Sequence, residues 1–326
     1  MNELSIRNTS LINYDKLNIE SLLEDFYKSI DVGEETKRTY KKGIANFLDY
    51  LKKNNITQLD KKIMLEYKTH LINTYEPTTA TTYLSGVRNL FNFLEEFGVP
   101  NLMRNIKGVK ISRDFKKQPL AREQTKKILK NKKDNLETLK DYRDYALFNL
   151  LVHNGLRTIE VERANKSDIM QISGQFVLKI QGKGKTDKTQ TAVLTDSVLI
   201  PLLAYMNERG EDSFEPLFIG VSNRCYGSRL KTSSIRRIIK DMIVANGYIS
   251  KQLSTHSLRH TALTYALKGG ASLQETKELG RHSDINTTLI YAHNINRIEN
   301  APEFYVEKYL HGEDIKEGVS EEKKEI

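Results

Sequence analysis

Apolar side chains recur at helical spacing through the first hundred residues, and this periodicity constrains the fold more than any other feature of the sequence. Between residues 34 and 53 they are spaced i, i+4, i+7, i+8 and i+11, at Tyr40, Ile44, Phe47, Leu48 and Leu51. Similar patterns follow Asn18, Asp60 and Pro77, residue types that favour the start of a helix. Four short amphipathic helices can close a small bundle, which we place at residues 18–105.

The second half of the chain has a different pattern, because two β-rich runs interrupt the helices. FVLKIQ and TAVLT flank the polar, glycine-bearing stretch QGKGKTDKTQ, which predicts a β-hairpin. Helical patterns precede it at 121–131 and 137–153, and others return from about residue 196. We therefore predict a mainly α protein with a small β-sheet, of the α+β class.

Positive charge is concentrated between these two halves. The chain has a net charge of +9, and residues 101–130 alone carry +8, with ten Lys or Arg against two acids. A basic run can be an ordinary solvated face, but it is also typical of a polyanionic partner. The predicted organisation is an N-terminal extension, a helical domain, a basic linker, a second domain and a charged tail, at 1–17, 18–105, 106–120, 121–312 and 313–326. Since only about seventeen residues precede the helices, we expect no separate arm-binding domain.

Composition excludes several classes of protein. No stretch approaches the ~18 apolar residues of a membrane span, and the N-terminus lacks the apolar core of a signal peptide. The single cysteine, Cys225, excludes an intrachain disulfide and a multi-cysteine zinc site. These features predict a cytoplasmic protein without a membrane partner.

The residues that could carry chemistry gather in the segment 255–294. His256, Arg259 and His260 are three and four residues apart, so they lie on one side of a helix that we expect to begin near Ser254. These could be ordinary polar helix residues, or the two histidines could bind a metal. A metallopeptidase would need a glutamate where Ser257 stands, however, and Arg259 would place a cation beside the metal. We therefore expect no metal site.

A phosphate site is the third interpretation. Arg, His and Lys side chains can neutralise a phosphodiester while a tyrosine hydroxyl attacks it. Because the transition state spreads negative charge, the site needs more than one arginine, and its leaving oxygen needs a proton donor. Arg157 in GLRTIEV, after the helix stop Asn154-Gly155, and Lys183 or Lys185 in the hairpin turn could supply these groups.

The order of these motifs resembles that of the tyrosine recombinase (phage integrase) family, in its simple Xer-like, two-domain form. The family's catalytic domain carries Arg, a hairpin Lys, H-x-x-R, His and Tyr, and the matching positions are Arg157, Lys183, His256, Arg259, His282 and Tyr291. Glu160 matches an acidic position that follows the first arginine. The resemblance covers nearly the whole chain, since the predicted bundle resembles the family's SAM-like core-binding domain.

The resemblance implies a site-specific DNA recombinase, active in integration, excision, resolution or inversion. Tyr291 would attack the scissile phosphate, form a 3′-phosphotyrosine link and release a 5′-hydroxyl. Arg157 and Arg259 would bind the non-bridging oxygens, and Lys183 would protonate the leaving oxygen. The two histidines of the family pattern would complete the phosphate site and help to move protons. Because the covalent link conserves the energy of the phosphodiester, no cofactor is expected.

The implied partner is double-stranded DNA with paired recombination sites, bound by a homotetramer, and any accessory proteins are unknown. Backbone phosphates are expected to contact basic side chains of the bundle and linker, namely Lys37, Arg38, Lys41, Lys42, Lys110, Lys116 and Lys117. The alternatives are a monomeric type IB topoisomerase-like enzyme and a non-catalytic DNA-binding protein. The segment IENAPEFYVEKYLHG favours the recombinase, because the family docks such a helix on a neighbouring protomer.

The sequence departs from the family pattern near the second histidine. The family commonly has Leu-Gly-His, whereas here Arg281 stands between Gly280 and His282. We expect Arg281 to lie on the surface rather than on the phosphate. The assignment of the proton donor to Lys183 rather than Lys185 rests on its Gly-Lys-Gly context.

Overall fold

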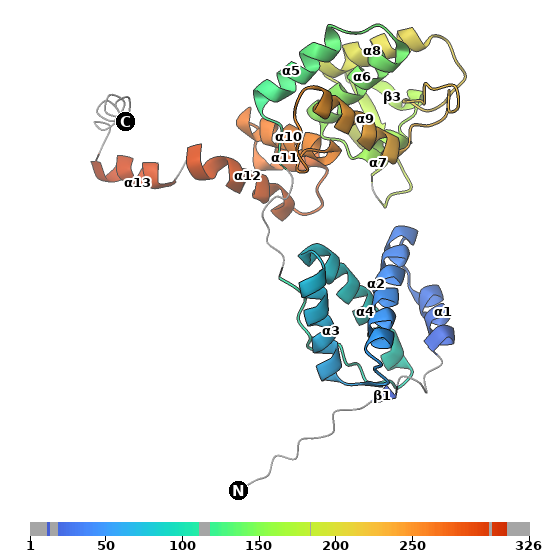
Figure 1. Ribbon diagram of the computed structural model, residues 1–326. Coiled ribbons are helices and arrows are strands. Elements are labelled where there is room, and N and C mark those ends of the chain that lie inside the picture. The colour runs from blue at the N-terminus through green and yellow to red at the C-terminus, as the bar shows by residue number, and fades with distance from the viewer. Residues whose placement is uncertain (1–11, 14–18, 111–117, 183, 300–301, 312–326) are drawn as a thin grey trace. The chain divides into compact units, whose positions relative to one another are not determined.

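The computed structural model describes residues 12–13, 19–110, 118–182, 184–299 and 302–311, and these are mainly helical with a small sheet (Figure 1). The predicted α+β class is confirmed. The chain divides into two compact units, Met1–Arg113 and Asp114–Ile326. Among the described residues, no helix combines the length and apolar character needed to cross a membrane.

The first unit is a bundle of helices α1 (Ile19–Ser29), α2 (Glu34–Lys53), α3 (Lys61–Thr74) and α4 (Pro77–Glu96). Two short strands, β1 (Ile12–Asn13) and β2 (Gln58–Leu59), pair antiparallel beside it. Asp60 caps α3 as expected, because its carboxylate accepts a 2.8 Å hydrogen bond from the Ile63 N–H. The expected cap Asn18 lies outside the described residues.

Helices α2 and α4 approach closely because each has a glycine at their contact. A Cβ atom at Gly43 would lie 2.9 Å from the backbone of Tyr83, and one at Gly86 would lie 3.1 Å from the backbone oxygen of Tyr40. The core of the bundle extends along the chain to Ile106, whereas Leu120 is buried in the core of the second unit. The chain therefore begins to pack at both ends of the region that the sequence predicted to be linker.

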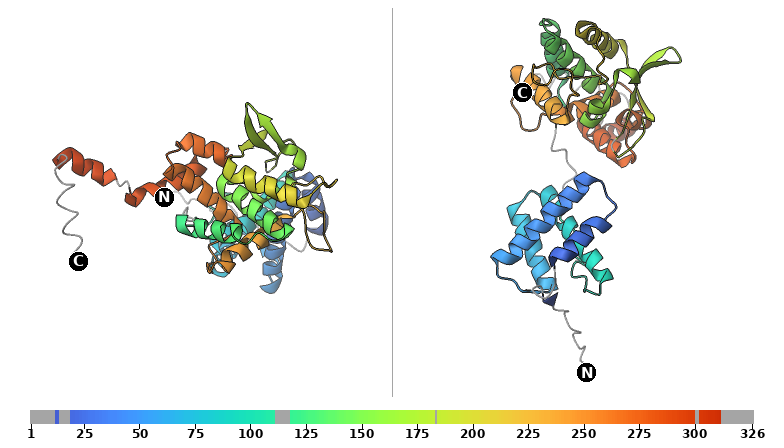
Figure 2. Two further views of the ribbon diagram at one scale, coloured as in Figure 1. Left: turned by 90° about the horizontal axis from the view of Figure 1, so that it is seen from above. Right: turned by 90° about the vertical axis from the view of Figure 1, so that its right-hand side faces the viewer.

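In the second unit, several helices pack against α6 (Leu139–Asn154), most of whose residues are buried (Figures 1 and 2). The other helices, in chain order, are α5 (Arg122–Lys133), α7 (Thr158–Arg163), α8 (Asp196–Arg209), α9 (Thr232–Ala245), α10 (Thr255–Lys268), α11 (Leu273–Gly280), α12 (Asn286–Glu299) and α13 (Pro302–His311). The short 3-10 helix η2 (Lys166–Asp168) leads into the sheet.

The sheet has the antiparallel order β3-β4-β5, with strands β3 (Ile169–Ile172), β4 (Gln175–Ile180) and β5 (Gln190–Val193). Strands β4 and β5 form the predicted hairpin, with Leu178 opposite Ala192. Strand β3 was not predicted, because its four residues are too few for a clear alternation.

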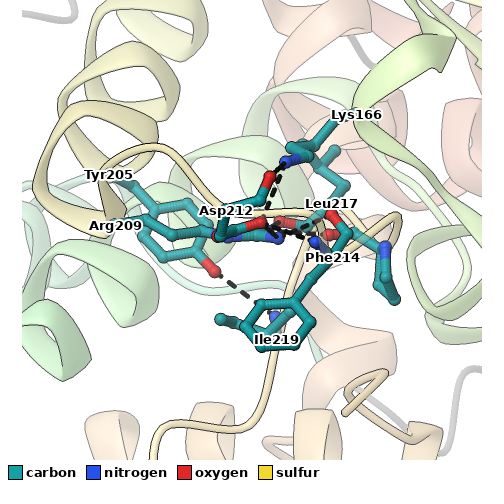
Figure 3. Close-up of polar contacts among 8 residues, drawn as sticks. Lys166, Tyr205, Arg209, Asp212, Phe214, Leu217 and Ile219 are labelled. Atoms are coloured by element: carbon teal, nitrogen blue, oxygen red, sulfur yellow. Dashed lines mark hydrogen bonds and ion pairs between the residues drawn. The ribbon is translucent and has the colours of Figure 1, made fainter. Parts of the chain in front are cut away.

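A buried network holds the irregular segment after α8 (Figure 3). Arg209, 6% exposed, donates hydrogen bonds to Asp212 and to the carbonyls of Phe214, Pro216 and Leu217. These bonds from Arg209 hold the pKa of the Asp212 carboxyl well below its usual range. This network holds in place the segment between α8 and α9, which is described in full and forms no regular helix or strand.

Candidate active site

The turn after α6 places Arg157. Helix α6 ends at Gly155, whose left-handed conformation (φ +57°) suits glycine because a side chain would be strained there. Arg157 then caps α7, and its backbone N–H and guanidinium each donate a 2.8 Å hydrogen bond to Glu160. Glu160 is buried, whereas the Arg157 side chain is 30% exposed. Arg157 is therefore anchored but still reaches the surface of a pocket.

Arg259 lies on α10, which begins after Ser254 as predicted, and is only 2% exposed. Its guanidinium donates to the carbonyl of Gly155 at 2.7 Å and to the carbonyl of Gly280. Burial, and then the charges of Arg157 and Arg281, lower the pKa of Arg259 to about 10, so it remains cationic at neutral pH. Arg259 thus joins the ends of α6 and α11.

His282 follows α11 in a tight C-terminal turn. Ser272 and Glu275 form a capping box at the start of this helix. At its end, the Arg281 N–H donates to Glu278 and the His282 N–H to Lys277, the pattern of a Schellman motif. A Cβ atom at Gly280 would lie 2.9 Å from the His282 ring, so glycine is needed here for close approach.

Tyr291 lies on α12 and is 4% exposed. Burial raises the pKa of Tyr291 to about 12, although Arg259 and Arg157 offset part of this effect, so the hydroxyl is protonated at neutral pH. Asp284 stabilises the start of α12 by accepting a 2.9 Å hydrogen bond from the Asn286 N–H.

Two imidazoles lie beside this tyrosine, and a third packs against one of them. The His260 and His282 rings lie 5.2 and 6.2 Å from the Tyr291 ring, and the His256 ring lies 4.6 Å from that of His260. Burial, followed by nearby positive charge, lowers the pKa of both His260 and His282 to about 4. Both are therefore neutral at pH 7. The sequence placed His260 on the correct side of its helix but gave it no role.

One pocket of about 1150 Å³ collects most of the predicted catalytic residues. The members that line it are Arg157, His256, Arg259, His282 and Tyr291. Lys183 lies outside the described residues, whereas Lys185 lines the pocket. Arg163 of α7 donates to the Gly182 carbonyl at 3.1 Å, which ties the hairpin turn to α7. In the part of the chain that the structure describes, no three His, Cys, Asp or Glu side chains form a metal-binding cluster.

The prediction for Arg281 was wrong. Its side chain is 4% exposed rather than on the surface, and it forms a 3.2 Å ion pair with the buried carboxylate of Glu160. The sequence shows only an arginine after a helix-ending glycine. Folding brings that position to a carboxylate more than a hundred residues earlier in the chain.

The predicted DNA-contacting residues of α2 lie at or near the surface. Arg38, Lys41 and Lys42 are exposed, and Lys37 is half-buried beside Glu34, with 3.7 Å between the charged atoms. Lys110 is exposed. The remaining two, Lys116 and Lys117, lie outside the described residues.

Helix α13 presents apolar side chains to solvent. Phe304 and Leu310 are 57% and 66% exposed, and Tyr309 is 89% exposed. From the sequence, Tyr265 and Tyr305 are both expected to be packing residues rather than nucleophiles, but Tyr305 is 70% exposed. Tyr265 instead donates a 3.1 Å hydrogen bond to the Leu120 carbonyl within the second unit.

Comparison with known proteins identifies the family. The phage integrase family model matches residues 118–297, and the model of the phage integrase N-terminal SAM-like domain matches residues 19–98. The tyrosine recombinase XerD of Staphylococcus epidermidis is 28% identical over 291 residues, covering 84% of this chain and 94% of that protein.

Solved structures show the same fold. The XerH site-specific recombinase, in a post-cleavage complex with palindromic difH substrate, has a TM-score of 0.71 at 20% identity, over 88% of this chain and 84% of that one. A lambda integrase tetramer bound to a Holliday junction has a TM-score of 0.66 at 16% identity, over 86% and 78%. Since the phage integrase model alone spans more than half of the sequence, the chain belongs to the phage integrase family of tyrosine-type site-specific recombinases.

Proposed function

We propose that this chain cuts and rejoins duplex DNA at specific sites by transesterification at Tyr291. The observation that carries the proposal is a phenol in a pocket lined by three arginines and three imidazoles. Arg157 is anchored through Glu160 but 30% exposed, so its guanidinium can bind a phosphate oxygen. Arg259 adds positive charge from the wall of the pocket.

The reaction exchanges one phosphodiester for another. The Tyr291 oxygen attacks phosphorus, an O–P bond forms, and the bond to the 5′-oxygen breaks. The 5′-oxygen takes a proton from the hairpin lysine, Lys183, with Lys185 as the competing donor. Attack by a 5′-hydroxyl on the phosphotyrosine reverses the steps and joins the strands. Bond energy is conserved, so no cofactor is needed.

The proton of Tyr291 has to leave during attack, because burial raises the pKa of this group to about 12. His282 and His260 are unprotonated at neutral pH and lie beside the ring, so they can accept it or relay it. After burial, the charge of Arg259 contributes to the low pKa of both imidazoles. A bound phosphodiester would offset that positive charge and raise their basicity when the substrate is in place.

The DNA would be bound by both units, with the bundle as a core-binding domain and the second unit as the catalytic domain. The basic residues of α2 and the segment 101–130 would contact backbone phosphates, which makes binding steeply dependent on salt. The exposed apolar residues of α13 would dock on a neighbouring protomer and link four subunits on paired sites. A lambda integrase tetramer on a Holliday junction has the same fold.

The covalent intermediate provides the test. Purified protein is incubated with a library of nicked, randomised duplexes, SDS-resistant adducts are recovered, and their DNA ends are sequenced to find the site. Wild-type protein should form the adduct in the presence of EDTA, and Tyr291→Phe should bind the selected DNA without forming it. A Tyr291→Phe variant that still forms the adduct would refute the assignment of the nucleophile, and a strict metal requirement would refute the mechanism.

A further inference from the structure

Arg281 is a buried cation in the wall of the pocket, and the mechanism above does not use it. Its side chain is 4% exposed, and one terminal nitrogen lies 3.2 Å from a Glu160 carboxylate oxygen. The same nitrogen donates to the carbonyls of Gly155 at 3.2 Å and Asn154 at 3.4 Å. Its Nε is buried without a hydrogen-bond partner among the described residues. These contacts are to the protein, so Arg281 is not placed as a phosphate ligand.

Arg281 shares one acceptor with each of the two other arginines of the pocket. The Glu160 carboxylate also accepts both hydrogen bonds of Arg157. The Gly155 carbonyl also accepts the 2.7 Å hydrogen bond of Arg259. A single guanidinium therefore touches the anchor of Arg157 and the anchor of Arg259.

We propose that Arg281 is a positioning residue that sets both the charge and the placement of Arg157 and Arg259 for cleavage; this inference rests on the proposed function. Three guanidinium groups and one carboxylate leave a net charge of +2 around Glu160. Without Arg281 the carboxylate would be compensated by Arg157 alone, which would hold that guanidinium more firmly on the protein and lessen its pull on the phosphate. With Arg281 in place, Glu160 is shared, and Arg157 can direct its charge into the pocket.

The backbone at this position makes a clean variant possible. Arg281 has φ +49°, the left-handed conformation that glycine adopts without strain. The turn around it is held by backbone N–H groups, from Arg281 to Glu278 and from His282 to Lys277. Arg281→Gly therefore removes the guanidinium while it preserves the turn that places His282.

The experiment compares four proteins on the nicked substrate selected above: wild type, Arg281→Gly, Arg281→Lys and the double variant Arg281→Gly with Glu160→Gln. The rate of adduct formation at saturating DNA and the Kd for DNA are measured separately. We expect Arg281→Gly to lower the rate about 100-fold, the size expected for a misplaced catalytic group, with a Kd within about threefold of wild type. Arg281→Lys should retain an intermediate rate, because it keeps the charge but loses the planar fork.

The double variant distinguishes positioning from simple packing. If an uncompensated Glu160 retains Arg157, then Glu160→Gln in the Arg281→Gly background should recover about tenfold of the lost rate. A purely structural role predicts further loss instead. Ser173→Gly is the matched control, since Ser173 also has a left-handed backbone (φ +49°) but lies in the exposed β3–β4 turn. It should cleave like wild type.

The outcomes separate the two hypotheses. A wild-type chain that forms no adduct overturns the proposed function and this inference with it. An active wild type with an equally active Arg281→Gly overturns only the role of Arg281. So does a double variant slower than Arg281→Gly, or a loss confined to Kd.

Discussion

Replacement of Gly280 by alanine tests whether close approach of the His282 ring to α11 matters for cleavage. A Cβ atom at position 280 would lie 2.9 Å from Cε1 and 3.0 Å from Nδ1 of His282. Ordinary carbon contacts begin near about 3.5 Å, so the ring has to move by roughly 0.5 Å. That movement disturbs the 3.0 Å contact between His282 Nδ1 and Thr288 Oγ1. Because a misplacement of 1 Å can lower a rate about 100-fold, we expect cleavage to fall about tenfold.

Stability should not explain this loss. Gly280 lies in α11 without a positive φ, so alanine is not strained there, and alanine is favoured over glycine within a helix by up to about 1 kcal/mol. The assay is single-turnover adduct formation on nicked DNA, with thermal unfolding measured in parallel. His282→Ala and the double variant with Gly280→Ala complete a cycle, in which the double should be no slower than His282→Ala alone. A Gly280→Ala protein that cleaves at the wild-type rate would refute the reasoning.

Three further predictions concern the two proposed phosphate-binding arginines, the C-terminal helix and the pH dependence of stability. Arg157→Lys and Arg259→Lys keep the charge but lose the fork, so each should lower cleavage about 100- to 1000-fold while the Kd for DNA changes little; wild-type-like cleavage in either would make that arginine structural. Truncation after Ile298 removes the exposed apolar helix α13, so binding to a single site should persist in a gel-shift assay. Synapsis of paired sites and strand exchange should be lost in a recombination assay, and unchanged recombination would favour a monomeric enzyme. The pKa of His260 and of His282 is about 4 in the folded protein and near 6.5 in the unfolded chain, so the unfolded chain binds more protons between these two pH values. The free energy of unfolding should therefore fall as pH is lowered from 6.5 towards 4. His260 is 5% exposed and contributes on the order of 3 kcal/mol to this loss, so His260→Gln should flatten the pH dependence of the urea midpoint, and an unchanged slope would contradict its buried, neutral state.

Much of this fold could be predicted from interactions between residues that are close together in the sequence. The apolar spacing of residues 34–53 reflects the 3.6-residue helical period, and the structure has α2 over that range. Gly155 ends α6 because it takes a left-handed conformation at little cost, and Ser272 begins α11 because its side chain satisfies a free backbone N–H. These features depend on residues within one or two turns of each other. The order of the Arg, His and Tyr motifs likewise lies in the sequence, and it identified five residues that the fold gathers in one pocket.

Tertiary structure alone decided which charges share an acceptor. The sequence around Arg281 gives no sign that it is buried, since Glu278 and Asp284 could equally pair with it on the surface, yet the fold brings it to Glu160. The same holds for Gly280, whose lack of a side chain matters because the His282 ring folds back over it. His260 packs against Tyr291 only because α10 and α12 meet. Burial of a charge and the space around a ring depend on atoms from distant segments of the chain. The sequence therefore determined which residues make up the site. The packing of α6, α10, α11 and α12 determined how the charges of those residues act.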